Sequence, residues 1–222
     1  MPAVTAVGDS TASPTVRGYL HWVDSPPADG LVLAHGAGSD ARAPLLVALA
    51  GAFAAAGIAV LRIDLPFRQA RPHGPPYPAS AAQDRAGLKR AVTWLRAQLP
   101  GRVFLGGVSY GGRQCTILSA DEPDLAAGLL LLSYPLHAPG RHADLRTAHF
   151  PQLSTPTLFI HGTRDPFGSQ DEMRAALPLL AGPHELVFID GAGHDLGGKK
   201  PNTATAIVLE AFQRRFRTTR SG

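Results

Sequence analysis

A serine placed between a predicted strand and a predicted helix is the feature that most constrains this chain. Residues 107–111 read Gly-Val-Ser-Tyr-Gly, with Ser109 at the centre. The apolar run 102–106 precedes this pentapeptide, and the pattern predicts a helix from about 112 to 120. Gly-x-Ser-x-Gly between a strand and a helix is typical of a nucleophile elbow, a strained turn that lifts the serine hydroxyl above the end of a sheet. The flanking glycines leave room for neighbouring backbone at the bend.

The polar partners that such a serine needs follow it along the chain. A serine hydroxyl becomes a good nucleophile when a histidine takes its proton and a carboxylate orients that histidine. Asp165 lies in the loop after the strand-like run 157–160, and His194 lies in a glycine-rich loop after the run 186–190. Loops at the carboxyl ends of parallel strands line one crevice. We therefore predict that Asp165 and His194 meet Ser109, with Ser109 as nucleophile and His194 as base.

Two other carboxylates compete with Asp165 for the ring of His194. Asp190 is closer to His194 in sequence, but it would end a strand rather than follow one. Asp195 is adjacent to the histidine. We favour Asp165 because it lies in a loop at the carboxyl end of its strand, as Ser109 and His194 do.

An oxyanion hole is predicted from the loop after another buried-strand pattern, residues 31–34. The loop reads His-Gly-Ala-Gly from His35. The backbone N–H groups of Ala37 and Tyr110 are the expected donors to a developing oxyanion. His35 is expected to support this loop by hydrogen bonding, with contact to the substrate as the alternative.

Strand-like and helix-like segments alternate along the chain. Alternation of this kind predicts one α/β domain over residues 1–222, with a mostly parallel doubly wound sheet and helices on both faces. Residues 1–14 are polar and contain proline, so poor order is expected at the start. The expected strands are 16–23, 31–35, 59–63, 103–107, 128–134, 157–161 and 186–190. The expected helices are 42–57, 82–98, 111–120, 171–181 and 202–217.

Two loops are expected to flank the crevice. The first, residues 64–78, contains Arg68, which could contact an anionic substrate group. The second, residues 134–156, offers about 20 residues, enough for a minimal lid but not for several helices. The cleft should therefore be open, and the substrate small or accessible. Arg113, just past the elbow, is expected to form an ion pair on a helix face, with a substrate clamp as the alternative.

Together these motifs resemble the α/β-hydrolase superfamily, and within it the small, nearly lidless hydrolases related to dienelactone hydrolases. The similarity covers about residues 30–216, and the matching stretches are 35–38, 107–113, 161–168 and 193–196. The resemblance implies an α/β-hydrolase fold and hydrolysis of an acyl bond. Residues 65–68 and 134–137 resemble pocket-side loops, which makes His137 a candidate substrate contact. Dienelactone hydrolases carry a cysteine where this chain has Ser109, so their substrate is not carried over.

Composition and charge indicate the compartment and the partners to expect. The single cysteine, Cys115, excludes an internal disulfide and fits a reducing compartment. Residues 1–13 do not read as a secretory signal, and no apolar stretch approaches the ~20 residues of a membrane span. We expect a cytoplasmic protein that acts on a small-molecule acyl substrate, without nucleic acid or membrane as partner; oligomeric state is not predicted. The net charge of +4 and the C-terminal arginines 214, 215, 217 and 220 come with no nucleic-acid motif and are expected to be solvated.

No metal or cofactor is predicted. His137, His142 and His149 are five and seven residues apart, which matches no compact metal-ligand spacing. The glycine-rich loops lack the lysine of a P-loop and the full dinucleotide fingerprint.

The sequence predicts a serine hydrolase that cleaves an ester, thioester or related acyl bond through an acyl-enzyme on Ser109, with peptidase activity left open. The alternative is a catalytically silent scaffold on the same fold.

Overall fold

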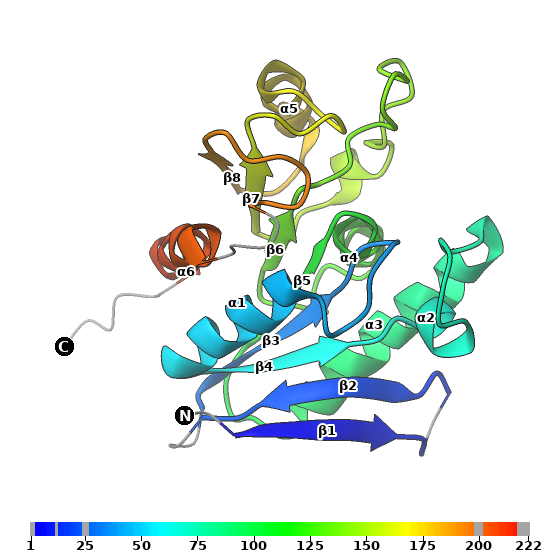
Figure 1. Ribbon diagram of the computed structural model, residues 1–222, viewed down its shortest axis with the longest axis vertical. Helices are drawn as coiled ribbons and strands as arrows, with labels where there is room; N and C mark the ends of the chain where they lie inside the picture. The colour runs from blue at the N-terminus through cyan, green and yellow to red at the C-terminus, as the bar shows by residue number, and fades with distance from the viewer. Residues whose placement is uncertain (1–2, 12, 24–26, 198–201, 217–222) are drawn as a thin grey trace.

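The computed structural model describes residues 3–11, 13–23, 27–197 and 202–216. Within these ranges eight strands form one sheet in the order β1-β2-β4-β3-β5-β6-β7-β8 (Figure 1). The strands are β1 (Val4–Asp9), β2 (Val16–His21), β3 (Asp29–Ala34), β4 (Ile58–Ile63), β5 (Val103–Val108), β6 (Leu129–Leu132), β7 (Thr157–Gly162) and β8 (His184–Ile189). Strands β3 to β8 pair in parallel, whereas β2 pairs antiparallel with both β1 and β4. The mostly parallel sheet expected from the sequence is therefore confirmed.

Helices cover both faces of this sheet (Figure 1). On one face α1 and α6 pack against apolar residues of β3 to β8, and on the other α3, α4 and α5 do so. Central strands such as β6 are buried at every position, which explains their continuous apolar runs. The helices are α1 (Pro44–Ala55), α2 (Pro66–Ala70), α3 (Ala81–Arg96), α4 (Tyr110–Asp121), α5 (Gln170–Ala176) and α6 (Asn202–Phe216). The connection from β6 to β7 contains one 3-10 turn, Phe150–Gln152, and no lid helix.

The structure departs from the sequence expectation at three elements. Strand β1 lies in the segment expected to be poorly ordered; it is an exposed edge strand held by its pairing with β2 rather than by a hydrophobic face. The five-residue helix α2 lies in the first loop, with Pro66 in its first turn. The helix expected over 171–181 ends at Ala176 and continues as a 3-10 turn around Pro178.

The structure also places the single cysteine and two of the C-terminal arginines. Cys115 is buried on α4, and its burial raises the pKa of the thiol. Of the C-terminal arginines, Arg214 pairs with Glu185 and Arg215 donates to the carbonyl of Pro183, while residues 217 and 220 lie outside the described ranges. None of the helices that the structure describes is both long and apolar enough to cross a membrane.

Candidate active site

Ser109 lies at the bend where β5 ends and α4 begins. Its backbone has φ 50° and ψ −114°, and residues other than glycine rarely adopt a positive φ. A Cβ at Gly107 would lie 2.7 Å from backbone atoms of the first turn of α4, and one at Gly111 would lie 2.5 Å from the carbonyl oxygen of His35. The two glycines therefore allow the strand, the helix and the loop after β3 to meet around Ser109.

A chain of hydrogen bonds joins the three residues that the sequence placed in order. His194 Nε2 lies 2.8 Å from Ser109 Oγ, and His194 Nδ1 lies 2.9 and 2.8 Å from the two oxygens of Asp165. The Asp165 carboxylate has no exposed surface and also accepts the N–H of Phe167 at 2.9 Å. A carboxylate facing Nδ1 fixes the proton there, so Nε2 is the acceptor facing the serine hydroxyl.

The two competing carboxylates have other contacts. Asp190 accepts a hydrogen bond from the hydroxyl of Thr163 at 3.3 Å. Asp195 accepts from the backbone N–H of Gly197 at 3.3 Å. Neither forms a hydrogen bond with His194 in the part of the chain that the structure describes, so the geometry selects Asp165.

The loop after β3 lies directly beside Ser109. A Cβ at Gly36 would lie 3.6 Å from the Cβ of Ser109. The next residue, Ala37, and the first residue of α4, Tyr110, both line the cleft. Neither of their backbone N–H groups donates a hydrogen bond to any described residue. Two unpaired donors thus lie at the position where the sequence predicted an oxyanion hole.

His35 does not contact the cleft. Its side chain is fully buried; Nδ1 donates to the carbonyl of Gly36 at 2.8 Å, and Nε2 accepts the N–H of Leu65 at 3.1 Å. Burial lowers the pKa of His35, which agrees with a neutral ring that uses one nitrogen as donor and one as acceptor. His35 therefore supports the loop, and the alternative of substrate contact is not supported by its position.

Arg68 is not positioned as a substrate contact either. The residue is buried on α2, and its guanidinium donates to four backbone carbonyls. The acceptors and distances are Ser39 (2.9 Å), Ala37 (2.9 Å), Gly74 (3.0 Å) and Arg71 (3.3 Å). Every nitrogen of the guanidinium is thereby engaged in tying the Ala37 loop to the segment after α2. Arg68 therefore holds the backbone of these two loops together, and its donors are not free for the anion contact that the sequence suggested.

His137, the third candidate substrate contact, lies outside the cleft. Its side chain is buried, with Nδ1 2.8 Å from the carbonyl of Ala138 and Nε2 3.2 Å from Glu172. The neighbouring Pro135 lines the cleft instead. Both residues are buried, but only Pro135 lies on the cleft side, and the local sequence carries no signal for that difference.

Asp84 on α3 is a site residue that the sequence did not reveal. Its carboxylate is fully buried and accepts the hydroxyl of Tyr110 at 2.6 Å and the N–H of Phe67 at 2.9 Å. Burial first, and then the Asp84 contact, raise the pKa of the Tyr110 hydroxyl above its usual value. Asp84 thus joins the start of α4 to α2. In the sequence Asp84 was visible only as an acidic residue near the start of a helix. Acidic residues are common at that position, so it did not mark a site.

The cleft above Ser109 has a volume of about 830 Å³, within the usual range for small-molecule sites. The proline-rich segment 75–78 forms part of its wall, in place of a lid. Three arginines, Arg85, Arg113 and Arg146, also line it, and Asp195 is the one carboxylate among the described lining residues. The side chain of Arg113 makes no ion pair or hydrogen bond with any described residue, and its Nε is buried without a partner. The ion pair expected at Arg113 is therefore absent.

Solved structures of similar shape come from several hydrolases. A dienelactone hydrolase from Anabaena variabilis is 24% identical, with a TM-score of 0.76 and coverage of 97% of this chain and 99% of that one. XC6422 from Xanthomonas campestris, described as an α/β serine hydrolase without a lid, is 17% identical, with a TM-score of 0.75 and coverage of 97% and 96%. Est1E from Butyrivibrio proteoclasticus is 16% identical, with a TM-score of 0.75 and coverage of 95% and 98%. At these identities the likeness shows the fold.

Sequence comparisons match a short part of one known enzyme and, with a family model, nearly the whole chain. Epoxide hydrolase A of Mycobacterium tuberculosis (strain ATCC 25618 / H37Rv) is 43% identical over 58 residues, which is 26% of this chain. The match spans only 18% of the length of that enzyme. The model of the alpha/beta hydrolase domain family matches residues 27–217, nearly the whole chain. The chain is therefore a member of the alpha/beta hydrolase family.

Proposed function

We propose that this protein is a serine hydrolase that cleaves an ester or thioester of a small, negatively charged acyl substrate. The observation that carries the proposal is the hydrogen-bonded chain from Ser109 Oγ through His194 to the buried Asp165. A serine with an imidazole acceptor at 2.8 Å, itself oriented by a carboxylate, is arranged for nucleophilic attack. The serine hydrolase relatives of the same fold and the open cleft agree with it.

The proposed reaction runs through two tetrahedral intermediates. Ser109 Oγ attacks the acyl carbon while His194 Nε2 takes its proton, and Asp165 stabilises the resulting imidazolium. The N–H groups of Ala37 and Tyr110 stabilise the oxyanion. The intermediate collapses as His194 returns the proton to the leaving alcohol or thiol. Water then attacks the acyl-enzyme with His194 as base, which releases the acid and restores Ser109.

The charge of the cleft supports an anionic substrate. The Arg113 side chain has no hydrogen-bond or ion-pair partner among the described residues, and the side chain of Arg146 makes only one long hydrogen bond, 3.4 Å to the carbonyl of Pro135. Burial and then the nearby charge of Arg113 lower the pKa of Arg146, as two cations facing the same space would. A substrate carboxylate between them would relieve this repulsion and give both guanidinium groups charge-assisted hydrogen bonds.

A fluorophosphonate probe followed by intact-mass analysis tests the proposal. The wild-type protein should gain one adduct, and Ser109→Ala should gain none. Ser133→Ala is the matched control, since Ser133 also has φ 50° at a strand end but is buried. Ser133→Ala should label as the wild type does. A native protein that stays unlabelled while a reference serine esterase reacts would favour the alternative, a catalytically silent scaffold.

A further inference from the structure

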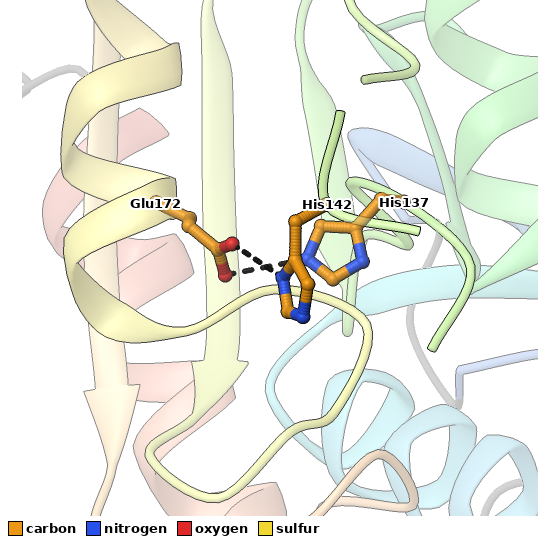
Figure 2. A group of neighbouring side chains, drawn as sticks. All are labelled: His137, His142 and Glu172. Atoms are coloured by element: carbon orange, nitrogen blue, oxygen red, sulfur yellow. Dashed lines mark hydrogen bonds and ion pairs between the residues drawn. The ribbon is translucent and has the colours of Figure 1, made fainter. Parts of the chain in front are cut away.

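A second group of polar side chains lies outside the cleft. The segment after β6 contributes His137 and His142, and the first turn of α5 contributes Glu172 (Figure 2). His137 Nε2 lies 3.2 Å from one Glu172 oxygen, and His142 Nδ1 lies 2.8 Å from the other. One ligand atom from each of the three residues lies within 4.8 Å of the others. None of the three lines the cleft above Ser109.

The hydrogen bonds around His137 leave a lone pair facing an anion. Its Nδ1 is 2.8 Å from the carbonyl oxygen of Ala138, which can only accept, so Nδ1 carries the proton. In a neutral imidazole the other nitrogen, Nε2, is then an acceptor. That acceptor faces the carboxylate of Glu172 in a position with about 1% of the side chain exposed. Two acceptors this close need either a proton or a metal ion between them.

We propose that His137 Nε2, His142 Nδ1 and the Glu172 carboxylate bind one Zn²⁺ ion. A tetrahedral zinc ion with bonds of about 2.0–2.1 Å holds its ligand atoms about 3.3 Å apart. The nitrogen–oxygen separations are 3.2 Å from His137 to one Glu172 oxygen and 2.8 Å from His142 to the other, so small side-chain shifts would reach that spacing. Two imidazoles and one carboxylate favour zinc over magnesium or calcium, which prefer oxygen ligands. His142 is largely exposed, so water can reach the ion as a further ligand.

The surrounding contacts orient two of the ligands in the manner of a built metal site. The carbonyl of Ala138 fixes the ring of His137, a partner of the kind that zinc-bound histidines usually have. The N–H and hydroxyl of Ser169 donate to the Glu172 carboxylate at 2.8 and 2.7 Å. The first of these bonds, with the bond from the Glu172 N–H to the Ser169 hydroxyl at 3.3 Å, forms the capping box at the start of α5. The carboxylate is thus held by its own helix before any cation binds.

The site would lie beside the loop after β7, which carries Asp165. The N–H of His137 donates to the carbonyl of Phe167 at 3.1 Å, and the Phe167 ring stacks on His194. None of the three ligands lines the cleft, so the role assigned to zinc is structural. It binds the folded chain and should stabilise it by mass action. This inference does not depend on the proposed hydrolysis.

Zinc titration of the untagged, chelator-treated protein tests the site. We expect one equivalent of Zn²⁺ to bind with a Kd of about micromolar or tighter, and the melting temperature to rise by roughly 5–10 °C at a hundred times Kd. Co²⁺ in place of zinc should give the visible absorption of a tetrahedral complex. His142→Ala and Glu172→Gln should each weaken binding about 30-fold or more; glutamine can keep the capping box, so α5 should still form.

The control is His184→Ala, which removes an exposed histidine on β8 and should bind zinc as the wild type does. His194→Ala should also retain the site, because His194 belongs to the cleft. Binding weaker than about millimolar in the wild type would overturn the proposal. So would one-equivalent binding that survives in both His142→Ala and Glu172→Gln, since the metal would then lie elsewhere.

Discussion

The ring of Phe167 is stacked on the imidazole of His194, with centroids 4.0 Å apart and 27° between the ring planes. The backbone N–H of the same residue donates to Asp165 at 2.9 Å. Phe167 therefore touches both the ring and the carboxylate that orients it. The sequence motif that contains Asp165 extends over Phe167, but its contact with the histidine becomes visible only once the loops after β7 and β8 are placed together.

Phe167→Ala should lower kcat for a small ester about tenfold or more, because the imidazole loses the surface that holds its plane while the backbone bond to Asp165 remains. Initial rates of p-nitrophenyl acetate hydrolysis measure this effect. Phe167→Tyr retains an aromatic face and should restore most of the rate. A kcat for Phe167→Ala equal to that of the wild type would mean that Asp165 alone positions the ring.

Ser109→Ala should reduce turnover of p-nitrophenyl acetate on the order of 10⁴-fold while leaving the melting temperature nearly unchanged. The double variant with His194→Ala should be little worse than either single variant, because the two residues act in one proton transfer. Steady-state rates of the three variants provide the comparison. Losses that multiply would show that the two side chains act in separate steps.

Arg113→Gln should lower kcat/KM about 10- to 100-fold for an ester that carries a terminal carboxylate, such as a p-nitrophenyl hemisuccinate. A charge-assisted hydrogen bond contributes about 1.5–3 kcal/mol. The uncharged p-nitrophenyl butyrate, similar in length, should be hydrolysed almost as before. Arg174→Gln on the exposed face of α5 makes the same charge change away from the cleft and should affect neither ester. Equal losses for both esters would remove the case for anion binding.

Arg68→Ala should behave differently from Arg113→Gln. Four backbone carbonyls lose their donor, including that of Ala37, so kcat should fall for charged and uncharged esters alike. The melting temperature should fall by several degrees, since unsatisfied buried carbonyls cost about 1–3 kcal/mol each. Arg68→Lys should recover little, because an ammonium cannot reproduce the fork of donors. Differential scanning fluorimetry and the two-ester assay together check this. A loss confined to the charged ester would restore the anion contact first expected for Arg68.

Stability should fall as the pH drops from about 6.5 to 4, in part through His21. Its Nε2 accepts the Nε–H of Arg62 at 2.9 Å, and burial, then the charge of Arg62, lower the pKa of His21 to about 4. The unfolded chain, with a histidine pKa near 6.5, binds the proton first, so acid favours unfolding. The shift corresponds to about 3 kcal/mol. Urea unfolding of wild type and His21→Gln at pH 7 and pH 4.5 should show a smaller pH dependence in the variant; equal dependence would place the effect on other groups.

The positions of most strands and helices, the bend at Ser109 and the order of Ser109, Asp165 and His194 follow from the sequence. Each is a local pattern: a continuous apolar run for a doubly covered strand, glycines where backbones meet, and polar residues just after strand ends. Edge strand β1 escaped prediction because its residues are largely exposed and its stability comes from pairing with β2. A hydrophobic pattern reveals a strand through its buried residues, and β1 has few buried residues.

Only the tertiary structure decided how the charged and polar side chains are used. Arg68 and Arg113 look alike in sequence, yet one donates to four backbone carbonyls and the other faces the cleft without a partner. His137 and His142 have no metal-ligand spacing of their own and meet Glu172 only because α5 packs beside the segment after β6. The physical reason is the same in each case. The role of a polar side chain depends on the groups that it contacts. Strand order and loop packing bring those groups together from distant parts of the chain.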